Sequence, residues 1–235
     1  MTKKVKEDKV KDKISLGTTL LNLAFSGKSD GGIEPGTIVN MVGTSKSGKT
    51  FLVLSILADI ANNPKFNDYR LIFDDAEFRN NFNMIKLFGT DLQKRLEVPF
   101  PDCTCEYSAT IEDLKASIYA KTREGRSYIY ILDSVDGLTA ESEEDKSDAS
   151  AEKILERKKN GKESTTKDKG TMVGMIKAKE AHALFRSINN KIVESGSILI
   201  LISQAKWKVK TIFPIKTRAC ETALEFFSSV VIWLS

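Results

Sequence analysis

Apolar positions along the chain form short continuous runs, separated by longer segments in which they recur at helical spacing. The short runs end in polar or glycine residues, as buried β-strands do. They lie at residues 38–42, 69–73, 128–132, 198–202 and 229–234. Helical spacing predicts helices at residues 50–61, 111–124 and 173–194. This alternation predicts an α/β fold, a mostly parallel twisted sheet with helices on both faces.

Two segments fall outside this alternation. Residues 1–13 are rich in lysine and almost without apolar side chains, which predicts a mobile basic tail ahead of one ordered unit at 14–235. Residues 141–170 intermix acids and bases at high density. Such a segment buries too little surface to offset the entropy of ordering, so we expect a disordered surface insertion. A loop that orders on a partner is the alternative.

Composition narrows the class of protein. Hydrophobic residues make up 41% and charged residues 29%, and no apolar stretch is long enough to span a membrane. The charged N-terminus does not resemble a secretory signal, and Cys103, Cys105 and Cys220 are too few for a disulfide framework. A reduced, cytoplasmic setting is therefore expected. The net charge of +4 permits a nucleic-acid partner without requiring one.

The loop after the first predicted strand matches G-x-x-x-x-G-K-[ST] and opens a predicted helix, the context of a phosphate-binding loop. Unpaired N–H groups at a helix N-terminus attract phosphate oxygens, and a lysine adds positive charge. The sequence thus predicts ATP and Mg²⁺ as cofactors, with a chance match in a glycine-rich turn as the alternative. The predicted nucleotide-binding residues are Gly43, Thr44, Ser45, Lys46, Ser47, Gly48, Lys49, Thr50 and Phe51.

Carboxylates end two of the other predicted strands. Asp133 follows the strand at 128–132, where it could hold magnesium together with the hydroxyl of Thr50; a turn-capping aspartate is the alternative. Glu77 lies just beyond the strand at 69–73 and could activate the water that attacks the γ-phosphate. Asp74 and Asp75 are rival candidates, and the residue pattern alone does not choose among the three.

Gln204 follows the strand at 198–202, where a neutral amide could sense the γ-phosphate; a solvent-facing polar residue is the alternative. A basic segment follows at 206–218. Cations track a nucleic-acid backbone and aromatic rings stack on unpaired bases, which predicts nucleic-acid binding. A strand pair with a solvated lysine face and core aromatics would fit the same pattern. The predicted contacts are Lys206, Trp207, Lys208, Lys210, Phe213, Lys216 and Arg218.

Taken in order, these motifs resemble the RecA family of strand-exchange ATPases, and among them the phage recombinases of the UvsX type. The resemblance runs from about Ile14 to the end. It implies a RecA-like P-loop core, with Glu77 as the water-activating residue, Lys49 and Gln204 as its catalytic partners, and residues 141–170 at the first DNA-binding loop. It also implies single-stranded DNA as partner and self-association into a filament or ring. The motifs are the phosphate loop, residues 31–36, Asp75-Ala76-Glu77, Asp133-Ser134-Val135, Leu138-Thr139, Ile202-Ser203-Gln204 and Ala223-Leu224.

One departure from the family pattern stands beside the basic segment. The family usually has two glycines before the Ala-Leu element, and here Cys220 and Glu221 occupy those places. Two other readings share the phosphate loop, Glu77 and Asp133: a hexameric RecA-type DNA motor, and a RecA-like regulator that holds ATP without productive turnover.

Overall fold

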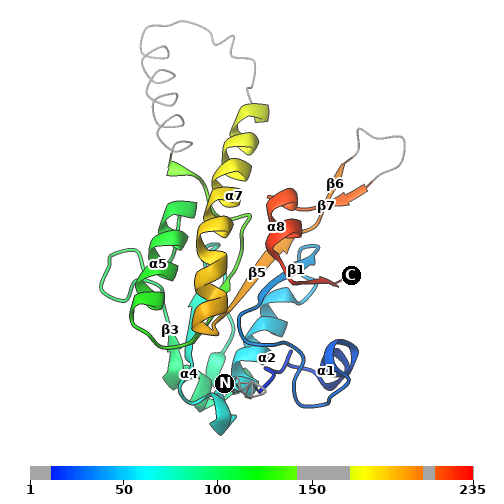
Figure 1. Ribbon diagram of the computed structural model, residues 1–235, viewed down its shortest axis with the longest axis vertical. Coiled ribbons are helices and arrows are strands. Elements are labelled where there is room, and N and C mark those ends of the chain that lie inside the picture. The colour runs from blue at the N-terminus through cyan, green and yellow to red at the C-terminus, as the bar shows by residue number, and fades with distance from the viewer. Residues whose placement is uncertain (1–11, 142–169, 209–214, 235) are drawn as a thin grey trace, which may run out of the picture.

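A six-stranded sheet forms the centre of the computed structural model, which describes residues 12–141, 170–208 and 215–234 (Figure 1). The strand order is β3-β2-β4-β5-β1-β8, and every neighbouring pair is parallel, so the predicted α/β architecture is confirmed. A separate antiparallel pair, β6 and β7, follows β5 in the chain. The strands are β1 (Ile38–Gly43), β2 (Arg70–Asp74), β3 (Leu96–Glu97), β4 (Tyr128–Leu132), β5 (Ile198–Gln204), β6 (Lys206–Lys208), β7 (Ile215–Thr217) and β8 (Val230–Leu234).

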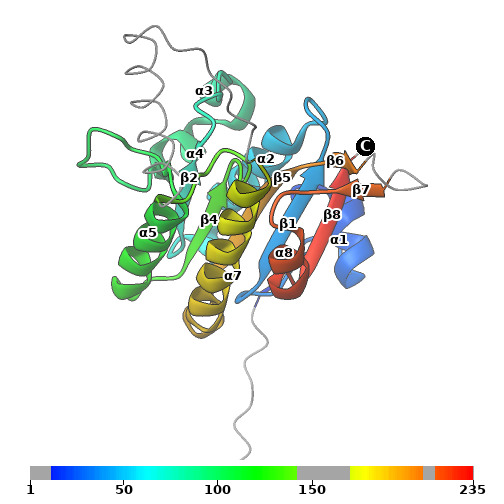
Figure 2. The ribbon, with the colours of Figure 1, turned by 90° about the horizontal axis from the view of Figure 1, so that it is seen from above.

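Helices cover both faces of the sheet, as Figure 2 shows. On one side lie α5, α7 and α8, and on the other lie α1 and α2, with the short helices after β2 beyond them. The helices are α1 (Thr19–Ser26), α2 (Lys49–Ala61), the 3-10 helix η1 (Pro64–Phe66), α3 (Met84–Phe88), α4 (Thr90–Arg95), α5 (Ile111–Arg123), α7 (Gly170–Ser195) and α8 (Glu221–Phe227).

The two helical layers create two hydrophobic cores, one on each face of the sheet. Strand β4 contributes side chains to both. Ile129 and Ile131 belong to the core under α2, whereas Tyr128, Tyr130 and Leu132 belong to the core under α5 and α7. Successive side chains of a strand point to opposite faces. A strand covered on both faces must therefore be apolar at every position, which is why the sequence showed continuous runs rather than alternation.

The predicted boundaries are close to those of the structure. The strand expected at 69–73 is Arg70–Asp74, and the helix expected at 173–194 is Gly170–Ser195. The helix expected at 111–124 is Ile111–Arg123, and a reciprocal cap between Thr110 and Asp113 fixes where it begins. The predicted tail at 1–13 and insertion at 141–170 lie largely outside the described residues, and both stay predictions.

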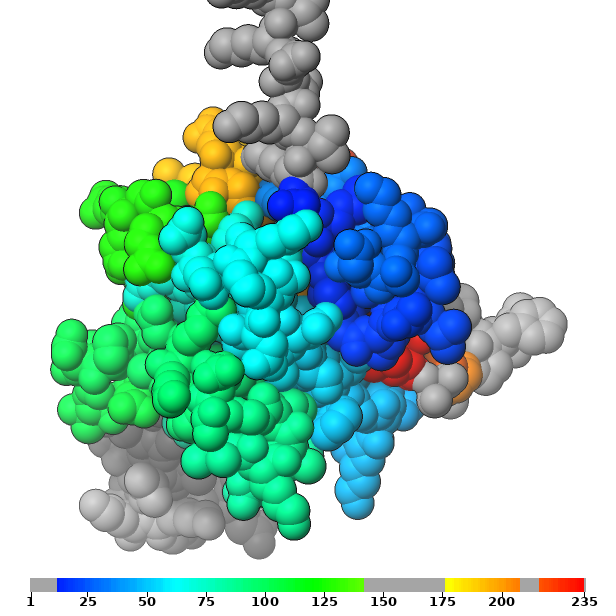
Figure 3. Space-filling view, turned by 90° about the horizontal axis from the view of Figure 1, so that it is seen from below, coloured from blue at the N-terminus to red at the C-terminus, as the bar shows by residue number. Residues whose placement is uncertain are grey.

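The sequence analysis did not predict α1, α3, α4 or α8. Helix α1 buries little of its apolar surface, since Leu20, Leu23 and Phe25 are all exposed, Leu20 to 80%. What holds it is polar: the buried Asn22 amide accepts from Leu16 N–H at 2.7 Å and donates to Ser29 O at 3.0 Å. Figure 3 shows this N-terminal region in blue beside the cyan end of α2 and η1. Ile14 and Leu16 enter the same core as α2, which anchors this segment.

Candidate functional site

The phosphate loop joins β1 to α2, and its glycines are required by space and backbone angle. A Cβ on Gly43 would lie 2.4 Å from Ser47 Oγ and 2.9 Å from Leu234 O. Gly48 has φ +85°, a left-handed conformation that costs other residues free energy. Lys46 has φ 63°, so the loop doubles back before α2 begins. The loop therefore presents backbone N–H groups around a concave turn, which suits phosphate oxygens.

Lys49 curls back over this loop. Its Nζ donates to Gly43 O at 3.0 Å and to Thr44 O at 2.7 Å, and the side chain is buried. Burial lowers the pKa of Lys49, while Asp133 and Glu77 act in the opposite direction by stabilising its charge. The ammonium is thus placed at the mouth of the loop among acidic neighbours, where an oxyanion would complete its coordination.

Thr50 and Asp133 meet beside the loop. Thr50 Oγ1 donates to Asp133 Oδ2 at 2.6 Å, which joins the start of α2 to the end of β4. Burial raises the pKa of Asp133 to about 6, and Glu77 and Asp75 add to the rise. A carboxylate and a hydroxyl in contact, in a region of excess negative charge, fit the oxygen ligands that Mg²⁺ takes.

The three carboxylates after β2 have different environments. Asp74 is fully buried and accepts from Tyr130 Oη at 2.7 Å and Ser108 N–H at 2.9 Å. Asp75 accepts from the N–H groups of Arg79 and Asn80, so it caps the turn after the strand. Glu77 alone of the three lines the pocket at the phosphate loop. The choice that the sequence left open therefore favours Glu77.

Glu77 is held from two directions. Its Oε1 accepts from Ser134 Oγ at 2.5 Å and from Gln204 Nε2 at 3.1 Å. Its Oε2 lies 3.3 Å from Arg79 Nη1. Gln204 is the last residue of β5, and its backbone lies in register with Gly43 of β1. The structure thus brings the predicted sensor into contact with the predicted water-activating residue.

These groups line one pocket of about 200 Å³ at the carboxyl ends of β1, β2, β4 and β5. Ligands of open α/β sheets bind at such ends. A larger hollow of about 330 Å³ lies between α1 and the far end of α2, away from these groups. The pocket at the phosphate loop is lined by Ser45, Lys46, Lys49, Thr50, Glu77, Arg79, Phe82, Asp133, Ile202 and Gln204.

Arg79 and Phe82 line this pocket although the sequence analysis did not single them out. Phe82 packs edge-on against Phe51, with ring centroids 6.1 Å apart. Phe51, a predicted nucleotide contact, is exposed on the first turn of α2. No motif marked Phe82 or Arg79, because both lie in an irregular stretch between β2 and α3 whose path only the fold reveals.

The basic hairpin consists of β6 and β7, and three of its predicted contacts, Lys206, Trp207 and Lys216, face solvent. Trp207 lies opposite Lys216, whose Nζ is 5.5 Å above the indole ring, and Trp207 is 55% exposed. The alternative that Trp207 is a core aromatic is therefore wrong. Lys206 pairs with Asp136, with Nζ to Oδ1 at 2.7 Å. Lys208 ends β6, and the predicted contacts Lys210 and Phe213 lie outside the described residues.

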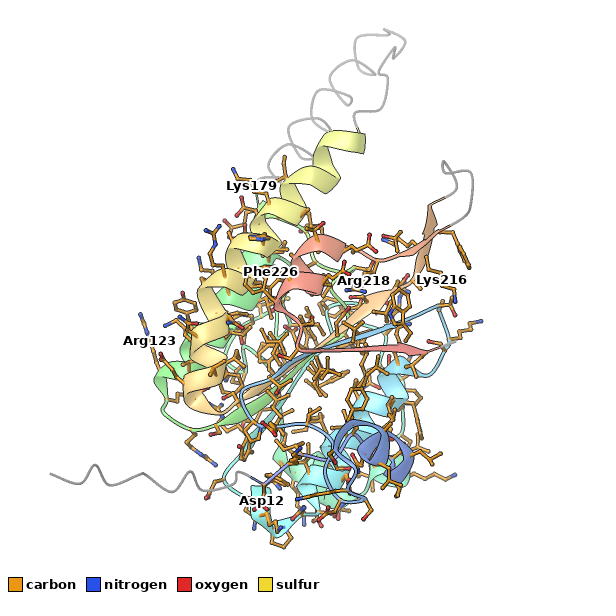
Figure 4. The ribbon with its side chains drawn as sticks, turned by 45° about the vertical axis from the view of Figure 1, so that its right-hand side comes forward. Asp12, Arg123, Lys179, Lys216, Arg218 and Phe226 are labelled. Atoms are coloured by element: carbon orange, nitrogen blue, oxygen red, sulfur yellow. The ribbon has the colours of Figure 1, made fainter. Side chains whose placement is uncertain are left out.

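Arg218 departs from its predicted role as a surface contact. It is 8% exposed, and its guanidinium lies 5.7 Å from the ring of Trp233 on β8. Figure 4 shows Lys216 on the outer side of the hairpin and Arg218 nearer to α8. The sequence could not predict that Lys216 is exposed and Arg218 buried. Both are basic residues that follow the same alternating lysines at 206–210. In this conformation Arg218 packs the hairpin against the sheet rather than facing a ligand.

The departure from the family glycines has a structural counterpart. Cys220 precedes α8 with φ 49°, in the left-handed region that favours glycine. Glu221 accepts a hydrogen bond from Thr217 Oγ1 at 2.6 Å, so its carboxylate is engaged at the base of the hairpin. His182 is half-buried on α7, with its ring 5.3 Å from that of Phe227. In the described segments, no helix combines the length and apolar character of a membrane span.

Comparison with known proteins places this geometry in a family. Residues 1–234 match the RecA N-terminal domain. The chain is 30% identical over 224 residues to Protein RecA of Helicobacter hepaticus, covering 93% of this chain and 54% of that protein. It is 27% identical over 218 residues to Protein RecA of Colwellia psychrerythraea, covering 92% and 53%. The chain thus spans about half the length of the curated relatives it matches. With a phosphate loop, a parallel sheet and a family match over nearly its whole length, the chain belongs to the RecA N-terminal domain family.

Proposed function

We propose that this chain is the ATP-binding core of a DNA recombinase, in which ATP binding and hydrolysis control single-stranded DNA binding by the basic hairpin. The observation that carries the proposal is the hydrogen bond from Gln204 Nε2 to Glu77 Oε1 at 3.1 Å. It joins the carboxylate best placed to activate water to the last residue of β5. The hairpin begins at Lys206, immediately beyond.

The residues fit ATP with magnesium. The concave loop at Gly43 and Gly48 would receive the phosphates, and Lys49 would neutralise charge on the β- and γ-oxygens. Thr50 and Asp133 would hold Mg²⁺, which when bound supplies positive charge to the transferring phosphoryl group. Phe51 and Phe82 add apolar surface at the edge of the pocket.

Glu77 supplies the base. Its Oε1 is engaged by Ser134 and Gln204, whereas Oε2 is paired only with the largely exposed Arg79 at 3.3 Å. Oε2 would therefore take a proton from the attacking water once Arg79 turns aside. Two neutral hydrogen-bond donors on Oε1 fix the direction of Oε2 without cancelling its charge. A base held in this way contributes typically about 10²–10⁴-fold to a rate.

Gln204 carries the coupling. Its amide is within hydrogen-bond reach of Glu77 and its backbone lies beside Gly43, so a γ-phosphate in the loop would compete for the same amide. Only Ala205 separates Gln204 from β6, so a change at Gln204 would reach the hairpin through one intervening residue. The lysines would then bind phosphates and Trp207 would stack on a base.

The finer parts of this proposal follow from the family rather than from the site. They are strand exchange, a role in recombination and repair, and assembly into a filament or ring. Closeness to the UvsX-type phage branch rests only on the resemblance of Ser45-Lys46-Ser47 in the phosphate loop. A hexameric DNA motor and an ATP-binding regulator use the same pocket. The motor would unwind forked DNA, and the regulator would bind ATP without turnover.

The test measures ATP hydrolysis with and without single-stranded DNA, together with fluorescence anisotropy of a labelled oligonucleotide in the presence of ADP or a non-hydrolysable ATP analogue. We expect tighter DNA binding with the ATP analogue and faster hydrolysis with DNA. Gln204→Ala should bind ATP normally and lose the difference between the two nucleotides. Gln93→Ala, the same change at an exposed position on α4, is the matched control. If wild type shows equal DNA affinity with both nucleotides, the coupling does not exist.

A further inference from the structure

Asp136 lies three residues after the predicted magnesium ligand and takes no part in the function proposed above. Its side chain is only 9% exposed; Oδ2 is hydrogen-bonded, whereas Oδ1 makes an ion pair without the geometry of a hydrogen bond. Oδ2 accepts the backbone N–H of Gln204 at 2.7 Å, and Oδ1 lies 2.7 Å from Lys206 Nζ. One carboxylate therefore touches the predicted sensor and the first lysine of the basic hairpin.

The segment after β4 contacts each working part of the site in turn. Asp133 contacts Thr50, Ser134 contacts Glu77, and Asp136 contacts Gln204. The negative charge of Asp136 also reaches Lys49, since it favours the protonated form of that lysine. Asp136 is thus the member of this segment that links the nucleotide pocket to the hairpin.

The two partners of the ion pair have unequal freedom. Lys206 is 57% exposed and sits on a long flexible stem, whereas Asp136 is nearly enclosed. A half-exposed ion pair is weak and readily exchanged. Lys206 can therefore leave for a phosphate group while Asp136 stays. A carboxylate and a nucleic-acid phosphate compete for the same ammonium group, and they repel each other.

We infer that Asp136 is a positioning residue that holds the Gln204 backbone and occupies Lys206, so that Lys206 reaches a phosphate of single-stranded DNA only when this ion pair opens. The inference rests on the proposed DNA-binding function of the hairpin. In this role the Asp136 carboxylate competes with DNA for Lys206, and its bond to Gln204 exposes it to any change at the sensor. Movement of Gln204 that weakens its bond to Asp136 would release the lysine.

The test uses Asp136→Asn in the full chain. The amide oxygen of asparagine still accepts from Gln204 N–H, while the charge opposite Lys206 is lost. Asp68→Asn removes the same charge from an exposed position just before β2, at the opposite end of the sheet, and is the matched control. Thermal melting of both variants checks that they fold.

The first measurement reports the ion pair without DNA. Acetylation of Lys206 by an activated acetate ester, followed by mass spectrometry, should be about two- to fivefold faster in Asp136→Asn than in wild type or Asp68→Asn. An unchanged rate means that Lys206 is already free and overturns the inference. If Asp136→Asn does not fold, Lys206→Gln breaks the pair from the exposed side and takes its place in the binding measurement below. It should then cost little affinity in the ADP state and much more with the ATP analogue; an equal loss in both states overturns the inference.

The second measurement is the salt dependence of oligonucleotide binding in the ADP state. Asp136→Asn should bind more tightly, with a slope of log K against log salt steeper by about 0.7, the value for one additional phosphate contact on a single strand. Lys206→Gln in that background should remove the gain. An unchanged slope, with Lys206→Gln already weakening wild type in the ADP state, overturns the inference but leaves DNA binding by the hairpin intact. No DNA binding by any of the proteins overturns the proposed function itself, and the acetylation rates distinguish that result.

Discussion

Replacing Asp133 by asparagine should stabilise this protein in the absence of nucleotide. The carboxylate is buried near Glu77 and Asp75, and burial raises its pKa from 3.8 to about 6. Asparagine keeps the shape and an oxygen that can accept from Thr50 Oγ1, the bond that now measures 2.6 Å. The substitution therefore removes the desolvated charge and retains the local hydrogen bond.

The magnitude follows from linkage between protonation and folding. A group whose pKa is higher in the folded than in the unfolded state stabilises the fold at low pH, and this stabilisation is lost as pH rises through the folded value. The rise from 3.8 to about 6 corresponds to about 3 kcal/mol, lost between pH 4 and pH 6 and fully absent above pH 7. Of this change in the free energy of unfolding, about 1.3 kcal/mol falls between pH 5 and pH 7.

Urea unfolding at pH 5 and pH 7 measures the effect. Other carboxylates also titrate near pH 4, so the useful quantity is the difference between wild type and Asp133→Asn at each pH. That difference should favour the variant more at pH 7 than at pH 5, by about 1 kcal/mol. Magnesium with an ATP analogue should reverse the order at pH 7, because only the carboxylate binds the cation well. If the difference in unfolding free energy between wild type and Asp133→Asn is the same at both pH values, Asp133 does not have the raised pKa assigned to it.

Four further predictions concern other parts of the molecule. Lys49→Ala should weaken binding of a fluorescent ATP analogue by about 2–5 kcal/mol, the cost of losing a charge-assisted contact; unchanged affinity would remove the phosphate-loop assignment. Glu77→Gln should bind the analogue normally but hydrolyse ATP roughly 10²-fold more slowly, whereas Asp75→Asn should not. Trp207→Ala should weaken oligonucleotide binding by about 1–3 kcal/mol with an unchanged melting temperature, since the ring is largely exposed; a fall in both would indicate a packing role. Cys220→Gly should be more stable to urea than Cys220→Ala by about 1–2 kcal/mol, because only glycine is free of strain at φ 49°; equal stabilities would contradict this.

The sheet and the long helices could be predicted because burial dictates their sequence pattern. Strands such as β4 and β5 are covered on both faces, so their apolar runs are unmistakable, and the phosphate loop is tied to its function by residue type and spacing. The short helices left no such signal. Helix α1 exposes Leu20 and depends on the amide of Asn22, a contact between residues whose proximity no local pattern reveals.

The sequence could identify residues of the site but not the contacts that they make. The residue pattern alone did not choose among Glu77, Asp74 and Asp75, although the family resemblance implied Glu77. Only the fold shows that the carboxylate of Asp74 is hydrogen-bonded to Tyr130 and Ser108. The same holds for the hairpin, where the sequence ranked Lys216 and Arg218 alike. Exposure separates them, and exposure depends on Trp233 from a strand that comes later in the chain. Ser134 was noted only as part of a motif, and Asp136 was not noted, because their partners Glu77 and Gln204 are distant in sequence.

The register of β1 bears on how quickly the site can respond. Gly43 lies between Gln204 on β5 and Leu234 on β8, and Ala205 N–H donates to Gly43 O at 2.9 Å. The backbone at the phosphate loop and the backbone at the sensor therefore form one cross-strand row inside a parallel sheet. Detection of the nucleotide at this row needs no displacement of strands, only rotation of the Gln204 side chain, which takes roughly picoseconds to nanoseconds where the side chain is accessible. Opening of the bond from the Gln204 backbone to Asp136 is a separate, later step. The slow steps of a cycle built on this frame then belong to phosphate chemistry and to release of the bound strand, and kinetic traces should show no separate phase for the sensor itself.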